Sequence, residues 1–197
     1  MGWMEYPLNK QDERAEIERI CTFEQDGVIQ RPVAMSKKGS AYYVAVESSG
    51  KDPGTYVADA DGRYVFAVVI LTSWRNGLFA YKPIEESMGP HYYEAPAKVL
   101  DALSGTSNEY AQKWRAACRR RHVEKRRAAN LKPGDRIRLA EPVYLAGEAE
   151  RDFTVTTYTR RGKARRAYHN ARFGLVRLAP DHLTGFELIE AASEPAS

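Results

Sequence analysis

Cysteine is scarce in this sequence, which contains only Cys21 and Cys118 among its 197 residues. Two cysteines are too few for a disulfide framework or a cysteine-based metal cluster, and such usage is typical of a reducing compartment. The longest apolar run, Tyr64 to Leu71, is far shorter than the roughly 20 residues of a membrane-spanning helix. Charges throughout the first 25 positions leave no apolar signal-peptide core. The sequence therefore predicts a soluble, cytoplasmic protein without membrane contact.

Motifs that would identify an enzyme or a metal site are also missing. There is no Walker loop, dinucleotide fingerprint or nucleophile elbow. The three histidines after residue 120 lack the spacing of zinc ligands. The segment "DADGR" (59–63) is similar to part of a calcium loop, but Val57 and Val68 would occupy its first and last ligand positions. We therefore predict an ordinary turn there, and no catalytic residue, metal or cofactor.

The charges that are present are unevenly distributed. Residues 1–110 contain 11 basic and 16 acidic side chains, whereas residues 111–177 contain 19 basic and 6 acidic ones, a balance of +13. Residues 178–197 contain no lysine or arginine and 4 acidic residues, so the whole chain carries +4. Such asymmetry between segments is a hint of contact with nucleic acid or a membrane, although it says nothing about the fold.

The first part of the chain has the pattern of an α+β domain. Apolar residues at helical spacing after Asn9, a suitable cap, predict a helix over 9–23. Val28 to Met35 contains Pro32 and is at best an edge strand. The segment "YVFAVVIL" (64–71) is apolar on both faces, which is typical of a central strand covered on each side. With a hairpin turn at Asn76-Gly77, residues 1–130 are expected to form an antiparallel sheet with flanking helices.

A long helix is predicted after Ser107 or Asn108. Its apolar stripe, which consists of Tyr110, Trp114, Ala117 and Cys118, ends where the helix becomes basic. The next positions of the stripe would be Arg121 and Lys125, so the basic turns cannot dock on a core as the first turns do. Residues 114–127 contain seven basic side chains and one acidic residue, Glu124. The basic residues are Arg115, Arg119, Arg120, Arg121, Lys125, Arg126 and Arg127. They indicate a nucleic-acid contact, a solvated face or an acidic protein partner.

From Leu131 the helical period gives way to short strands. Five strand-like segments follow within 60 residues, which favours a small closed barrel. A Pro-containing turn before the last strand is similar to the order of SH3-like barrels, by analogy only. We therefore predict an autonomous SH3-like β-barrel over 131–190 and a disordered tail over 191–197.

A second basic patch lies on the predicted hairpin of this barrel. It comprises Arg160, Arg161, Lys163, Arg165, Arg166 and Arg172. Guanidinium groups bind phosphates bidentately, and aromatic rings stack on unpaired bases. Tyr158, Tyr168 and Phe173 lie nearby, and each ring either stacks on bases or fills the barrel core. We include Tyr168 with the basic residues as a predicted nucleic-acid contact. No base-reading motif is present, so recognition would depend on the phosphate backbone.

Residues 81–94 also contain groups suited to acid–base chemistry. If they converge in a cleft, the candidates are Lys82, Glu85, Glu86, His91 and Glu94. Met88-Gly89-Pro90 instead favours a tight turn in which Gly89 supplies a special backbone conformation. A structural loop is the favoured interpretation, with a binding or catalytic cleft as the alternative.

The first 120 or so residues resemble an uncharacterised family of short proteins carried by phages, plasmids and integrative elements. The resemblance rests on features in the same order: Met1-Gly2-Trp3, "YYVAV", "VFAVVILT", "FAYKPIEESMGP" (79–90), "APAKVLDAL" (95–103) and "EYAQKWRAAC" (109–118). It implies an accessory protein of a mobile element, acting on host defence, but no established activity. The segment after Leu131 is covered less well, so its role rests on its own residues.

These observations support one leading function and two alternatives. The leading hypothesis is a non-enzymatic nucleic-acid-binding accessory protein, with DNA and RNA both open. The alternative is a protein-binding inhibitor of a host defence factor, which docks through its acidic N-terminal domain or through its basic face on an acidic host protein. The third is an enzyme with a cleft around residues 81–94.

Overall fold

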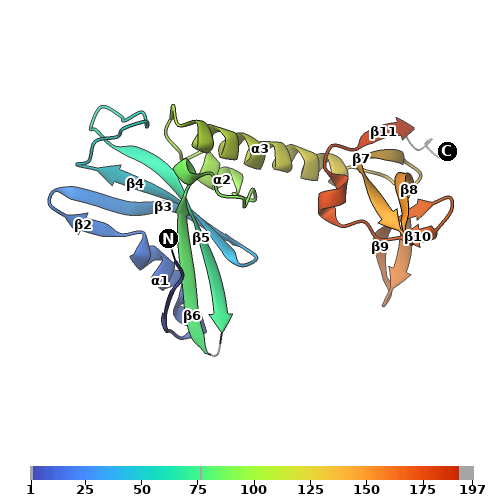
Figure 1. The fold of residues 1–197 in the computed structure, drawn as a ribbon, viewed down its shortest axis with the longest axis horizontal. Coiled ribbons are helices and arrows are strands. Elements are labelled where there is room, and N and C mark those ends of the chain that lie inside the picture. Colours follow the sequence, from blue (N-terminus) through green and yellow to red (C-terminus); the bar gives the residue numbers. More distant parts are fainter. Residues whose placement is uncertain (1, 76, 191–197) are drawn as a thin grey trace. The chain divides into compact units, whose positions relative to one another are not determined.

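The computed structural model describes residues 2–75 and 77–190, so Asn76 of the predicted turn and the predicted tail over 191–197 lie outside the described residues. The protein is mixed α and β, with mostly antiparallel strands (Figure 1). It divides into two compact units, Met1–Arg119 and Arg120–Ser197. This division falls inside the long helix, whereas the sequence pattern placed the domain boundary at Leu131. The basic end of the helix therefore belongs to the same compact unit as the C-terminal strands.

The first unit is built on a six-stranded antiparallel sheet in the order β1-β6-β5-β4-β3-β2. The first strand pairs with the last, which places the N-terminal segment at one edge of the sheet. The strands are β1 (Met4–Pro7), β2 (Phe23–Gln25), β3 (Val28–Lys38), β4 (Ala41–Ser49), β5 (Tyr64–Arg75) and β6 (Leu78–Glu85).

Both faces of this sheet are covered, as the sequence of β5 predicted. Phe66 and Ile70 on one face contact Ile17 of α1 (Glu13–Ile20). Ala67 and Val69, which point to the other face, belong to a second core that includes α2 (Ala97–Leu100) and the first half of α3 (Glu109–Ala129). The central position of β5 therefore follows from its period-2 alternation combined with burial on both sides.

Three local predictions for this unit need correction. The first helix begins at Glu13, after a 3-10 turn (η1, Lys10–Asp12), and the side chain of Asn9 caps neither. Tyr110 is exposed, and Ala111 takes the buried position in the first turn of α3. β3 is not an edge strand along its whole length, because β2 pairs with it up to Gln30. Beyond that pair its outer side has no strand neighbour among the described residues, and Pro32 lies there next to a bulge.

The second unit contains the end of α3 and a five-stranded antiparallel sheet in the order β10-β9-β8-β7-β11. The last strand returns to pair with the first, after a 3-10 turn (η3, Pro180–Leu183). Among the described residues no ladder joins β10 to β11, so the closure of the predicted barrel is not seen. The strands are β7 (Arg136–Leu145), β8 (Glu148–Arg160), β9 (Lys163–Asn170), β10 (Gly174–Val176) and β11 (Glu187–Glu190).

A separate apolar core holds this second unit together. Ile137, Phe153 and Val155 point from the sheet toward Leu183 and Phe186, and the last turn of α3 adds Ala128 at the margin. All of these residues lie in the part of the chain that carries the predicted basic surfaces. The core therefore fixes which faces of α3 and of the β8–β9 hairpin remain open to solvent.

Candidate nucleic-acid interface

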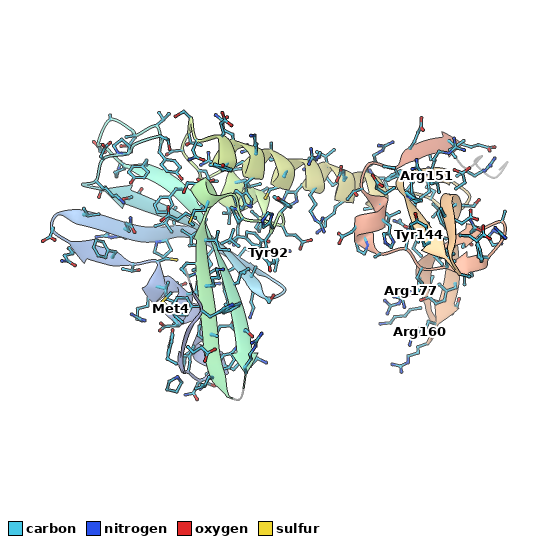
Figure 2. All side chains as sticks on the ribbon, viewed as in Figure 1. Met4, Tyr92, Tyr144, Arg151, Arg160 and Arg177 are labelled. Atoms are coloured by element: carbon cyan, nitrogen blue, oxygen red, sulfur yellow. The ribbon has the colours of Figure 1, made fainter. Side chains whose placement is uncertain are left out.

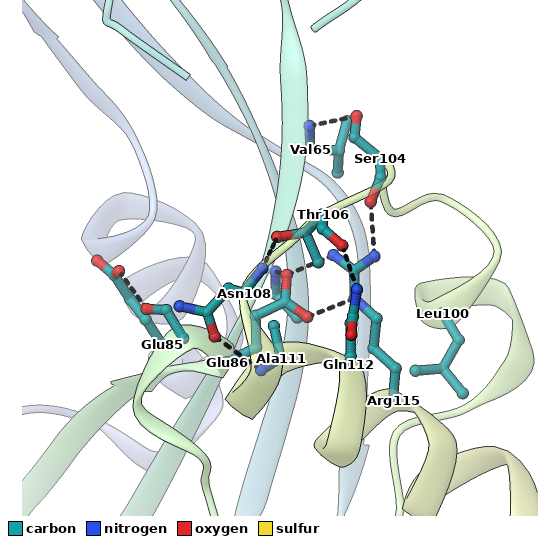
Figure 3. Close-up of polar contacts among 12 residues, drawn as sticks. Val65, Glu85, Glu86, Leu100, Ser104, Thr106, Asn108, Ala111, Gln112 and Arg115 are labelled. Atoms are coloured by element: carbon teal, nitrogen blue, oxygen red, sulfur yellow. Dashed lines mark hydrogen bonds and ion pairs between the residues drawn. The ribbon is translucent and has the colours of Figure 1, made fainter. Parts of the chain in front are cut away.

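The structure removes Arg115 from the predicted basic surface. Its side chain is 10% exposed, and its Nε and Nη2 donate to the two carboxylate oxygens of Glu86 at 2.7 and 2.6 Å (Figure 3). Nη1 donates to the carbonyl oxygen of Ser104 at 2.6 Å. Glu86 is fully buried and also accepts from the amide of Ala67. The prediction that Arg115 contacts nucleic acid is therefore wrong, because this guanidinium is occupied inside the first unit.

The same ion pair also accounts for part of the acid–base candidate set. Glu86 begins a 3-10 turn (η2, Glu86–Met88) that ends at Gly89, whose φ of 62° is in the left-handed region. A tight turn with a special glycine conformation was predicted at this position, and it is confirmed. Asn108 caps α3 by accepting from the amide of Ala111 at 3.0 Å, as was also predicted (Figure 3).

Arg119, the last residue of the first unit, remains exposed. Its Nη2 donates to the carbonyl oxygen of Leu100 at 3.3 Å and lies 3.9 Å from the carboxylate of Asp101. Arg119 therefore has local partners in α2 and in the residue that follows it.

The basic end of α3 presents two kinds of side chain. Arg121 forms an ion pair with Asp181 of η3, and the guanidinium of Arg127 lies 4.5 Å from the ring centre of Phe186. Three further basic residues of this segment, Arg120, Lys125 and Arg126, are exposed. The helix end is thus partly bound to its own unit, and its remaining cations face solvent.

Arg166 of the hairpin is largely used by the protein itself. Its guanidinium donates to the carbonyl oxygens of Ala128, Ala129 and Leu131 at the end of α3. The last carbonyls of a helix have no partner within the helix and carry a partial negative charge, so a cation stabilises them. Arg166 thereby holds the helix end against the sheet.

The register of the β8–β9 hairpin decides which aromatic ring can reach a ligand. Tyr168 is directly opposite Val155, and both side chains point into the core, where Tyr168 is 4% exposed. Tyr168, a predicted nucleic-acid contact, therefore lies on the core face of the sheet and not on the face of Tyr158. Tyr158 is opposite Arg165 on the other face of the sheet. It is half-buried and is the ring that the structure offers for stacking.

A groove at the hairpin, with Tyr158 in its lining, gathers most of the predicted hairpin cations. It has a volume of about 600 Å³, and the described residues that line it include no carboxylate. Tyr158 forms part of its wall, and Figure 2 shows Arg160 and Arg177 near one another on this unit. The basic lining residues are Arg160, Arg161, Lys163, Arg165, Arg166 and Arg177. Arg177 was missed by the sequence reasoning, although it directly follows Val176, which pairs with Tyr168, so strand alternation places it on the outer face.

Other arginines of the second unit are neutralised by carboxylates. Arg138 forms a bidentate pair with Asp152 at 2.7 Å for both bonds, and these bonds hold the pKa of Asp152 below its ordinary value. Arg136 pairs with Glu190. Arg172, a predicted nucleic-acid contact, pairs with Glu148, and its guanidinium lies 5.4 Å from the ring centre of Phe173.

The groove cations differ from these paired arginines. Within the described part of the chain, no carboxylate lies within ion-pair distance of Arg160, Arg161, Lys163, Arg165 or Arg177. Like charges held together repel, and a bound polyanion would relieve that repulsion. The groove therefore concentrates positive charge, with the ring of Tyr158 at its wall.

Comparison with known proteins adds one match. The model of a domain of unknown function (DUF6927) matches residues 105–180, a range that contains α3, the β8–β9 hairpin and every residue of the groove. The match covers less than half of the chain, and it overlaps the segment of the phage and plasmid resemblance only between residues 105 and about 120. No curated protein and no solved structure matches the chain. No helix in the described ranges is long and apolar enough to cross a membrane.

Proposed function

We propose that the protein binds nucleic acid through the groove between the β8–β9 hairpin and Arg177. The observation that carries this proposal is a concave surface that six basic side chains and a tyrosine line, with no carboxylate among the described residues there. Guanidinium groups suit phosphate oxygens because their N–H donors match phosphate geometry. A half-buried ring beside them adds a platform on which an unpaired base can stack.

The exposed cations of α3 belong to the same proposal. Arg120, Lys125, Arg126 and Arg127 are exposed and lie in the compact unit that holds the groove. Backbone charge rather than base edges would supply most of this affinity, so binding should depend strongly on salt. DNA and RNA both present the phosphates that such a surface binds.

The biological setting is part of this proposal. The resemblance over the first 120 residues supports an accessory protein of a phage or other mobile element that acts in the cytoplasm against host defence. An SH3-like identity for the second unit is supported by its chain order, since β11 follows a 3-10 turn and pairs with β7.

A second candidate function rests on an apolar patch of the first unit. Met88, Tyr92 and Tyr110 are 58%, 44% and 63% exposed. A Cβ at Gly89 would meet the ring of Tyr110 at 3.3 Å, which places this ring against the turn that follows Met88. Tyrosine and methionine are enriched at protein interfaces. This patch is the surface through which a protein-binding inhibitor would dock, and the acidic balance of the first unit would add charge selection.

A pair of matched triple variants tests the groove. The first variant replaces Arg160, Arg165 and Arg177 with Gln. We expect its affinity for a fluorescent single-stranded 20-mer at low salt to fall roughly 10- to 100-fold, because each exposed charge pair contributes up to about 1 kcal/mol. Fluorescence anisotropy measures the dissociation constants.

The control variant replaces the same number of charges at arginines that already have carboxylate partners: Arg136, Arg138 and Arg172. We expect less than a 3-fold loss of affinity, although the change in net charge is identical. Equal losses in the two variants would mean that only total charge matters. An absence of binding by the parent protein at low salt would refute the proposed function itself.

A further inference from the structure

A second pocket in the same unit differs in chemistry from the groove. It has a volume of about 310 Å³ and lies between the last turns of α3 and η3. Its floor is apolar, because Ala128, Leu178 and Leu183 line it together with the buried ring of Tyr168. This volume is at the lower end of the range of small-ligand pockets, which suits one flat ring rather than a large molecule.

The pocket and the groove share one lining residue. Arg166 lines both cavities, and its bonds to Ala128, Ala129 and Leu131 fix it at the boundary between them. A strand whose phosphates lie in the groove can therefore place a base in the pocket without leaving the surface of this unit.

The charged groups at the rim include a carboxylate. Glu124 lines the pocket together with Arg121, Lys125 and Arg166, of which Arg121 pairs with Asp181 and Arg166 donates to carbonyls at the end of α3. The described residues that line the groove include no carboxylate. A carboxylate repels phosphate and accepts hydrogen bonds from the exocyclic amino group of cytosine or adenine. Thymine and uracil have no amino group, and their one remaining ring donor, N3–H, lies between two carbonyl oxygens whose partial negative charges repel a carboxylate.

From these contacts we infer that the pocket binds one unpaired base that carries an exocyclic amino group. The inference rests on the proposed function, because the groove must hold the neighbouring phosphates. Glu124 is the residue that determines specificity, and the apolar floor with Tyr168 beneath it receives the ring. The protein is then a reader of single-stranded nucleic acid with a preference for amino-bearing bases.

The experiment compares a 12-residue oligo-dC with an oligo-dT of the same length at one salt concentration. The full-length parent is expected to bind oligo-dC about 5- to 10-fold more tightly, the equivalent of roughly one hydrogen bond to a charged acceptor. Glu124→Gln keeps the shape of the side chain but can donate as well as accept. Its ratio between the two strands should fall to within 2-fold, with no weakening toward oligo-dT.

Glu141→Gln is the matched control, because Glu141 is an exposed residue of β7 that lines neither cavity. This variant should keep the ratio of the parent. A ratio within 2-fold in the parent, or an undiminished ratio in Glu124→Gln with an unchanged thermal melt, would overturn the inference while leaving groove binding intact. Failure of the parent to bind either strand at low salt would instead refute the proposed function.

Discussion

Replacing Arg115 with Met should destabilise the first unit strongly. The carboxylate of Glu86 is fully buried, and this change removes its two guanidinium bonds at 2.7 and 2.6 Å. Only the amide of Ala67, at 3.1 Å, would remain of these hydrogen-bond donors. Removing one partner of a buried ion pair leaves an uncompensated charge, and the expected loss is about 3–5 kcal/mol of unfolding free energy.

The double variant Glu86→Gln/Arg115→Met tests that reasoning, because it removes both buried charges. The Gln amide oxygen can still accept from Ala67, so we expect the loss to shrink to about 1–2 kcal/mol. All three tryptophans, Trp3, Trp74 and Trp114, lie in the first unit, so tryptophan fluorescence during urea unfolding reports on that unit alone.

Two results would refute this account of Arg115. One is a loss of unfolding free energy below about 1 kcal/mol in Arg115→Met, since a buried charge that loses its partner should destabilise the unit by more than that. The other is a fall in oligonucleotide affinity larger than that of Arg138→Gln in samples that remain folded, since Arg115 would then act as a contact residue.

Two further predictions concern other parts of the molecule. Cys21 is 8% exposed, and burial raises the pKa of its thiol to about 12, so little thiolate forms at pH 8. Iodoacetamide should therefore label Cys21 only after denaturant is added. Rapid labelling of the native protein, detected by mass spectrometry, would contradict this prediction. Arg166→Gln should lower the unfolding free energy of the second unit by about 1–3 kcal/mol, because the carbonyl oxygens of Ala129 and Leu131 lose their donor. An unchanged thermal melt, followed by circular dichroism, would show that these bonds contribute nothing to stability.

Patterns of short range predicted much of the fold. β5 alternates between two buried faces, so its sequence indicated a central strand before any partner was known. The cap at Asn108 and the left-handed glycine at Gly89 followed from local chemistry. The change of period at Leu131 indicated that a second set of strands begins there. Each of these features depends on residues within a few positions of one another.

Features that depend on distant partners were harder to predict. Arg115 is one of seven basic residues between positions 114 and 127, and only the buried carboxylate of Glu86, 29 positions earlier, distinguishes it from the others. A helical stripe specifies a face to within about one residue, so Ala111 rather than Tyr110 became buried. The sequence contains no local signal for either outcome.

In the candidate site, the sequence alone did not predict which hairpin side chains lie on which face of the sheet. Tyr158 and Tyr168 are both close to hairpin arginines in the sequence, yet they lie on opposite faces of the sheet. Once Val155 is known to point into the core, alternation assigns Tyr168 to the core and Tyr158 to the groove. The sequence identified the basic hairpin correctly as a cluster, but the inward face had to be known before its residues could be divided between groove and core.

The salt dependence of binding tests the central claim most directly. The measurement is the slope of log affinity against log salt for a single-stranded 20-mer, in the parent and in the Arg160→Gln/Arg165→Gln/Arg177→Gln variant. If these three side chains contact phosphates, the slope should become shallower by roughly 2 units, since each contact on a single strand contributes about 0.7. An unchanged slope, with binding retained, would contradict the assignment of the groove as the nucleic-acid interface.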